Sequence, residues 1–170
     1  RFPYAQWTIQ PGGKLLDNRD SLEVTVSAEK KIGDHKFNME SKQVLAVTTQ
    51  GSSINTREII SEYSILKSTR VPLEITLAIP NSVLTGSKYD IDIILVKPLR
   101  NGVIAAGLMP INLNNNNTSI SSKIELTPMG GGGLFKSVRA PLKPGTQNWA
   151  ALLAHPKGLI SVSKLVKVVK

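Results

Sequence analysis

The residues with the most recognisable spacing form a glycine-rich run, Gly130–Ser137 (GGGGLFKS). This run differs by one residue from the phosphate-binding pattern G-x-x-x-x-G-K-[ST], because Phe135 stands where that pattern has a glycine. The pattern also needs a helix directly after the loop, since the N–H groups of the helix hold the phosphates. Pro141 and Pro144 follow soon afterwards, and the residues between favour a strand. We therefore predict a mobile loop, or one that another backbone approaches closely, and no nucleotide site.

The other candidates for chemistry are two histidines and two aspartates. The chain has no cysteine, which excludes disulfides, thiolate catalysis and cysteine zinc sites. His35 and His155 lie in or beside predicted turns, without the spacing of zinc ligands. Asp90 and Asp92 share one face of a predicted strand, as the carboxylates of a calcium site or a glycosidase do. Alternation on a solvent-facing surface explains the two aspartates equally well. With no G-x-S-x-G nucleophile motif either, we predict a non-enzymatic protein with no metal and no cofactor.

Positive charge is concentrated in the last fifty residues. Residues 121–170 carry eight Lys and Arg against one Glu, whereas residues 1–120 carry 13 against 11 acidic residues. Such an asymmetry favours an acidic partner, which means an acidic protein or an anionic membrane surface, although a solvated basic face that aids solubility has the same signature. The predicted partner-binding residues are Lys136, Arg139, Lys143, Lys157, Lys164, Lys167 and Lys170.

Nucleic acid is a less favoured partner for this basic region. Proteins that bind single strands combine basic residues with exposed aromatic side chains, on which the bases stack. Aromatic residues make up only 5% of the chain, and the basic region contains just Phe135 and Trp149. Both fit a hydrophobic core better than a stacking platform.

The elements that must position these residues are predicted to be strands. Apolar residues alternate with other residues in three runs, as on half-buried strands, and β-branched residues are abundant. The segment Thr56–Ser68 has helical spacing as well, but we predict a strand there. Glycine and proline turns separate the runs at the spacing of a β-sandwich. The alternating runs are Leu22–Ser27, Val71–Ile79 and Tyr89–Val96, and further strands are predicted at Trp7–Gln10, Lys123–Thr127, Leu134–Ala140, Trp149–His155 and Leu159–Val169.

Two of these segments look like matching hairpins. Each has a glycine turn, a large aromatic residue at the strand entrance, a Pro/Gly connection and an apolar return strand; the aromatic residues are Tyr89 and Trp149. Asn101-Gly102 is the strongest short hairpin signal, because a primed turn needs the positive φ that Asn and Gly tolerate. In the last predicted strand the apolar alternation changes phase, so we expect a β-bulge near Ser163-Lys164.

This arrangement resembles the penultimate and last strands of immunoglobulin-like and fibronectin type III-like sandwiches. In those families an aromatic residue after a glycine turn closes the corner between the sheets. Tyr89 matches this pattern, whereas Trp149 departs from it because its indole N–H donates but cannot accept. The Cys–Trp–Cys signature of antibody domains is absent. The segment Gly130–Val138 and the PGTQNWAALLAHPKG run also look like uncharacterised exported proteins of cyanobacteria.

The predicted architecture is an all-β, antiparallel, immunoglobulin-like β-sandwich of about ten strands. Residues 1–113 would form the main sandwich and residues 114–119 an Asn-rich loop. Residues 120–170 would form a basic C-terminal β unit packed on the same sandwich.

The predicted function is that of an exported, non-catalytic binding or accessory module that contacts an anionic surface or acidic partner through its basic C-terminal part. The alternative is a structural or assembly subunit of a larger extracytoplasmic complex, as a homo- or hetero-oligomer. Ile94, Val96, Ala150, Leu152 and Ala154 favour this alternative, because they are apolar on predicted solvent faces. Arg1 in place of a starting Met favours export, so we expect the periplasm, the thylakoid lumen or the cell surface.

Overall fold

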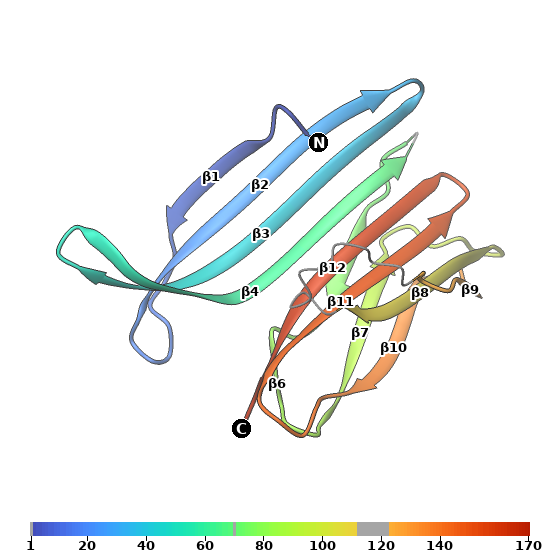
Figure 1. Ribbon diagram of the computed structural model, residues 1–170. Coiled ribbons are helices and arrows are strands. Elements are labelled where there is room, and N and C mark those ends of the chain that lie inside the picture. Colours follow the sequence, from blue (N-terminus) through green and yellow to red (C-terminus); the bar gives the residue numbers. More distant parts are fainter. Residues whose placement is uncertain (1, 70, 112–122) are drawn as a thin grey trace.

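The computed structural model describes residues 2–69, 71–111 and 123–170, and contains twelve strands and no helix within them (Figure 1). The predicted Asn-rich loop at 114–119 lies outside the described residues. The strands are β1 Gln6–Pro11, β2 Asp20–Ile32, β3 His35–Gln50, β4 Ser53–Thr69, β5 Ile75–Ala78, β6 Ser82–Leu84, β7 Lys88–Leu95, β8 Val103–Ile111, β9 Thr127–Gly130, β10 Gly133–Arg139, β11 Gly145–His155 and β12 Gly158–Val169.

Nine of the strands form one large sheet. Eight of them follow the order β1-β2-β3-β4-β12-β11-β8-β9, and the ninth, β6, pairs with β12 outside this order. All neighbours in this order are antiparallel. The short β6 pairs in parallel with the last residues of β12, Lys167–Val169. It lies on the same side of β12 as β4, which pairs with the earlier residues Gly158–Leu165. The remaining strands form a small antiparallel sheet in the order β10-β7-β5.

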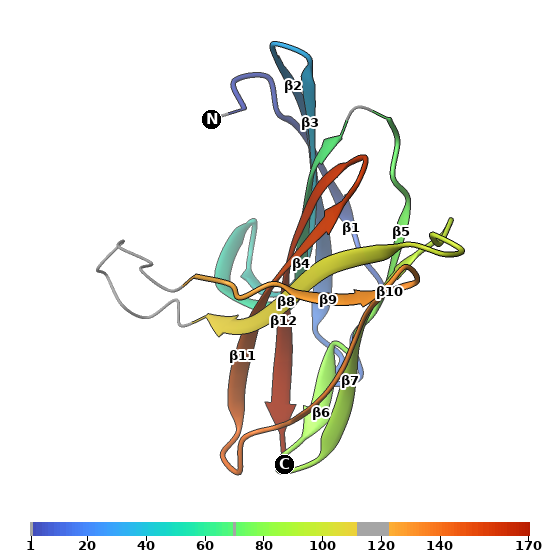
Figure 2. The same ribbon diagram turned by 90° about the vertical axis from the view of Figure 1, so that its right-hand side faces the viewer.

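The two sheets pack face to face and enclose the core of the molecule (Figure 2). Fully buried Ile93 of β7 and Leu134 of β10 meet Leu153 of β11 and Ile160 of β12 in one apolar cluster. The predicted all-β fold is therefore confirmed, with twelve strands in place of about ten. Strands β11 and β12 lie between β4 and β8, so residues before and after position 120 share the large sheet. The division into units at 113 and 120 stays a prediction.

The hairpin predicted at Asn101-Gly102 is wrong. Strand β7 belongs to the small sheet and β8 to the large sheet, so the connection crosses from one layer to the other. Neither residue has a positive φ, which a primed turn would require. Gly102 instead gives room to a neighbouring side chain, since a Cβ there would lie 2.9 Å from the Cβ of Leu99.

The second predicted hairpin is confirmed, and its aromatic residue meets that of the first segment. Strands β11 and β12 pair along their whole length from Gly145↔Val168 to His155↔Gly158. The indole N–H of Trp149 donates to the Tyr89 hydroxyl at 2.8 Å, and that hydroxyl donates to Gln147 Oε1 at 2.7 Å. The two segments thus close one end of the core together.

The strand predicted at 56–68 is confirmed as part of β4, whereas three other local predictions were inaccurate. Only Ile75–Ala78 of the run 71–79 pairs as a strand, and β9 begins at Thr127 rather than at Lys123. No bulge occurs near Ser163-Lys164, because the β11–β12 register is continuous there. Lys164 itself occupies a core-facing position of β12, where the alternation predicts an apolar residue.

Strands β1–β3 extend the large sheet beyond the sandwich. Neither apolar cluster of the core contains a residue of these strands, and β4 contributes only Ile65 and the partly buried Tyr63. In Figure 1 the three strands lie to the upper left of β12, β11 and β8, which face the small sheet. The chain thus consists of a two-layered sandwich and a single-layered extension.

Candidate surface-binding site

Three chain segments meet at the end of the sandwich where β6 and β12 end and β7 begins. The N–H of Gly86 donates to the carbonyl of Pro141 at 2.9 Å, and the N–H of Ala140 donates to the carbonyl of Ser87 at 2.9 Å. The N–H of Thr85 donates to the carbonyl of Val169 at 2.8 Å. We refer to residues 84–88, 139–143 and 169–170 as the basic end.

Local sequence explains the geometry of the turn in this basic end. Gly86 has a φ of 71°, which L-residues with side chains rarely adopt. The Ser87 hydroxyl closes the turn by donating to the carbonyl of Leu84 at 2.7 Å. The guanidinium of Arg139 donates to the carbonyl of Gly86 at 2.9 Å and so fixes the second segment against the turn.

Four exposed cations surround this junction, and its segments contain no acidic residue. Lys88 and Arg139 are directly opposite each other on β7 and β10. Lys143 follows one residue after Leu142, whose side chain lies beside Gly86, and Lys170 follows Val169 at the chain end. A cluster of positive charges at the tip of a domain produces a positive potential that attracts anionic surfaces.

Exposed leucines lie between these cations. Leu142 is 84% exposed and Leu84 is 60% exposed. Leu84 also pairs with Val169, which is itself exposed. Large apolar side chains grouped with cations at a loop tip are typical of surfaces that meet a membrane or a protein partner.

The structure brings together only some of the residues predicted to bind a partner. Arg139, Lys143 and Lys170 lie in the basic end, and exposed Lys136 lies on β10 three residues before Arg139. Lys157 lies in the turn between β11 and β12, at the opposite end of these strands.

Lys164 and Lys167 have structural partners. The buried ammonium of Lys164 donates to Asn81 Oδ1 at 2.5 Å, and its burial lowers the pKa, which the nearby Glu62 carboxylate partly opposes. Lys167 forms an ion pair with Glu58, which also binds Arg19 Nη1 at 2.7 Å. Hydrogen bonds from these two cations hold the pKa of Glu58 below its usual range.

Sequence reasoning missed Lys88, Leu84 and Leu142 as members of the site. Lys88 lies in the nearly neutral part of the chain, and only its pairing with Arg139 brings it to the other cations. The available signal was the turn Leu84–Lys88, which was interpreted only as part of a hairpin.

The glycine-rich loop has the structural role that was predicted as one alternative. A Cβ at Gly131 would lie 2.4 Å from the carbonyl oxygen of Leu99, and one at Gly133 would lie 2.1 Å from that of Ile93. Other backbone segments therefore approach this loop closely. The carbonyls of Gly131 and Gly132 accept hydrogen bonds from Leu99 and Leu95.

The candidate metal ligands do not converge in the part of the chain that the structure describes. Asp90 and Asp92 lie on the face of the small sheet that points away from the core, opposite Ser137 and Phe135 of β10. No group of three or more His, Asp or Glu side chains that could hold a metal ion occurs among the described residues. His155 is buried at the end of β11, where its Nδ1 accepts the N–H of Lys157 at 3.0 Å.

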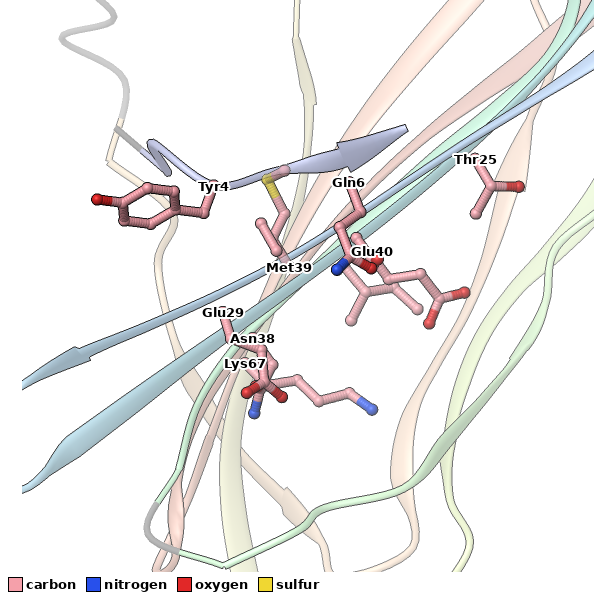
Figure 3. A pocket seen from close by; sticks show the side chains of 11 residues that line it. Tyr4, Gln6, Thr25, Glu29, Asn38, Met39, Glu40 and Lys67 are labelled. Atoms are coloured by element: carbon pink, nitrogen blue, oxygen red, sulfur yellow. The ribbon is translucent and has the colours of Figure 1, made fainter. Parts of the chain in front are cut away.

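A hollow of about 680 Å³ lies on the single-layered extension and the adjoining part of β4, and both polar and apolar side chains line it (Figure 3). Its labelled residues include Tyr4, Asn38, Glu40 and Lys67. Glu40 Oε1 accepts the Tyr63 hydroxyl at 2.9 Å, and burial together with this carboxylate raises the pKa of Tyr63 to about 12.

Comparison with known proteins adds a family but no activity. The model of a family described as a domain of unknown function (DUF8623) matches residues 70–169. This range contains strands β5–β12 and all of the basic end except Lys170. No curated protein matches the chain. No helix long and apolar enough to cross a membrane is found among the described residues.

Proposed function

Because the chain belongs to the DUF8623 family, a domain of unknown function, we propose a function from the geometry alone: it is a non-catalytic module that docks onto an anionic membrane surface by its basic end. Lys88, Arg139, Lys143 and Lys170 contact lipid headgroups. Leu84 and Leu142 enter the boundary between headgroups and acyl chains. The observation that carries the proposal is the grouping of these exposed leucines with cations in the three segments of the basic end, which contain no acidic residue.

The magnitudes are sufficient for reversible binding. Each Lys or Arg near an anionic leaflet contributes about 1 kcal/mol, so four contribute about 4 kcal/mol. Burying a leucine side chain adds about 1.5–3 kcal/mol. With two leucines, the total of about 7–10 kcal/mol corresponds to a dissociation constant on the order of micromolar or tighter.

A membrane fits this end better than an acidic protein does. The leucines project from two separate segments, and neither of them lines any of the four main hollows of the described residues. A lipid interface accepts single projecting apolar side chains without a matching pocket, and amphipathic membrane-binding surfaces combine such side chains with Lys and Arg.

Co-sedimentation with vesicles tests the proposal. We expect the protein to bind vesicles that contain phosphatidylserine, and not vesicles of phosphatidylcholine alone. Binding should weaken steeply from low to physiological salt, because the Debye length falls to about 8 Å at 0.15 M. Equal binding to both vesicle types would overturn the proposal. Equally strong binding to soluble poly-glutamate would indicate an acidic protein as the partner instead.

Three finer parts of the sequence-based account stay predictions. These are the extracytoplasmic location, the likeness to exported cyanobacterial proteins and the immunoglobulin-like classification. The packing of two antiparallel sheets and the aromatic corner at Tyr89 support the last of them.

A second candidate function is that of an assembly subunit. The observation that favours it is the apolar face of the large sheet. Ala150, Leu152 and Ala154 lie on that face and not on the face that packs on the small sheet.

A further inference from the structure

The strand register divides the nine-stranded sheet into two faces. Residues directly opposite each other on neighbouring strands project to the same face. One face contains Val162 of β12 and Ala151 of β11, which pack on the small sheet; we call it the core face. The other face contains Ser161 of β12 and its neighbours Leu152 of β11 and Leu66 of β4; we call it the outer face.

Every exposed large apolar side chain in the described strands of this sheet lies on the outer face. The pairing of neighbouring strands from β1 to β8 places all of them on this face, also where the β3–β4 register shifts. Trp7 is 67% exposed and Ile9 is 65% exposed, and both belong to the first strand. The complete set is Trp7, Ile9, Ile32, Ile54, Ile59, Leu66, Leu84, Val103, Leu159 and Val169.

Charge is distributed in the opposite way across β1–β3. The ion pairs Lys42–Glu23 at 3.1 Å and Lys36–Glu29 at 3.0 Å both lie on the core side of this extension, as does Glu40. Most residues that line the hollow of Figure 3, such as Glu40 and Lys67, lie on that side too. The single-layered extension therefore has one mainly charged face and one mainly apolar face, on which Asp20 and Lys30 of β2 also lie.

The middle of the outer face has a region without charged side chains over six neighbouring strands, bordered by Glu62 of β4, opposite Gln43, and by Lys30 of β2. We call this region the outer band. It contains apolar side chains from β1, β2, β3, β4, β12 and β11, with small polar ones between them. Its residues are Trp7, Ile9, Val24, Val26, Ala28, Met39, Ser41, Gln43, Ser64, Leu66, Leu159, Ser161, Ser163, Ala150, Leu152 and Ala154.

At one edge the chain covers the outer face itself. A Cβ at Gly107 of β8 would lie 2.1 Å from the carbonyl oxygen of Glu125 and 2.7 Å from Ile124 Cγ2. Gly107 is opposite Leu152, so residues 124–125 lie beside the outer band. Residues 124–125 therefore cover the outer face of β8 at Gly107.

We propose that the outer band is an interface between two copies of this chain, packed face to face. The band itself contains no charged residue and its borders carry charges of both signs, Glu62 and Lys30, so two copies can pack on it without a concentration of like charge, although each copy carries a net charge of +9. Two sheets that pack in this way lie about 10 Å apart, with their strands within about 30°. The inference rests on the assembly function and is independent of membrane docking.

The size of the band suits a stable dimer. Six strands about 4.8 Å apart, with about six residues each at about 3.3 Å per residue, span roughly 600 Å². Two such surfaces bury roughly 1,200 Å², which is the lower bound of standard protein interfaces. Trp7 supplies the kind of large aromatic side chain that carries much of the binding energy in such interfaces.

Sedimentation equilibrium without lipid tests this interface at micromolar concentration. We expect the wild-type chain to sediment as a dimer with twice its mass, 2 × 18.4 = 36.8 kDa. The double variant Trp7→Lys, Ile9→Lys should dissociate at least 100-fold more readily, because it places four lysines in a dry interface. Its control is Gln6→Lys, Thr8→Lys, which adds the same charge to exposed positions on the other face of the same strand and should leave the dimer intact.

A third variant separates face packing from pairing of the free β1 edges. Leu159→Lys changes an exposed residue of β12, which three strands separate from β1 in the sheet, and should also dissociate the dimer. Thermal unfolding of each variant verifies that it remains folded. A monomeric wild-type chain would overturn the inference. So would a dimer that survives either the Trp7→Lys, Ile9→Lys variant or Leu159→Lys.

Discussion

Replacing Lys88, Arg139 and Lys143 together by glutamate should reduce the affinity for phosphatidylserine vesicles by at least 100-fold. The three side chains are exposed at one end of the sandwich, within segments joined by backbone hydrogen bonds. Removing three attractive charges costs about 3 kcal/mol near an anionic leaflet, and the added carboxylates repel the headgroups. A loss of about 3 kcal/mol is roughly 150-fold in the dissociation constant.

The matched control places the same charge changes at the other end of the sandwich. Lys97, Arg100 and Lys157 are exposed near the turns that follow β7 and β11. Their replacement by glutamate changes the net charge by the same amount, and vesicle binding should fall less than tenfold. If both triple variants lost the same affinity, net charge rather than the basic end would control binding. Arg139 also donates to the carbonyl of Gly86, so unfolding curves of both variants are needed.

Trp149→Ala should lower the free energy of unfolding by about 3–5 kcal/mol, the range for truncating a large buried aromatic side chain. The indole is buried beside Val166 and Val168 of β12. Its removal creates a cavity at the end of the core where the two sheets meet. It also removes the donor to the Tyr89 hydroxyl. Urea denaturation, monitored by circular dichroism, measures this difference.

Two conservative variants separate the hydrogen bonds from the packing. Tyr89→Phe preserves the ring but leaves the indole N–H and Gln147 Oε1 without their partner, so we expect a loss of about 1–3 kcal/mol. The control is Tyr4→Phe, because Tyr4 is exposed and its substitution should change stability by less than about 0.5 kcal/mol. Equal stability of Tyr89→Phe and the wild type would contradict the structural role of this pair.

Local alternation predicted the strands well where both partners lie close in sequence. The β11–β12 hairpin was predicted from Trp149–His155 and Leu159–Val169, since its short connection leaves few other pairings. The segment Thr56–Ser68 was also predicted correctly as a strand despite its helical spacing, because its β-branched residues suit a sheet.

Predictions failed where long-range pairing decides the structure. Asn101-Gly102 has the residues of a hairpin turn, but Ile93 and Ile104 on either side belong to opposite layers, which share one apolar cluster. Sequence spacing cannot distinguish such a crossing from a hairpin. Lys164 interrupts the apolar alternation of β12, and this interruption led to the predicted bulge. The residue that accepts a hydrogen bond from its buried ammonium, Asn81, lies 83 positions away in the chain, so local spacing could not reveal it.

The candidate site was predictable in composition but not in position. Arg139, Lys143 and Lys170 were identified from the charge of the last fifty residues. The contributions of Lys88 and Leu84 depend on strand pairing with β10 and β12, which the charge distribution does not reveal. Conversely, Lys167 was included although Glu58, more than a hundred positions earlier, pairs with it.

An environment-sensitive fluorophore at position 142 tests most directly whether the basic end meets the membrane. The chain has no cysteine, so the variant Leu142→Cys is labelled at one position only, and Lys157→Cys provides the matched label at the opposite end. With phosphatidylserine vesicles, we expect the emission of the label at 142 to shift to the blue, while the label at 157 stays unchanged. No shift at 142, or equal shifts at both positions, would contradict docking by the basic end.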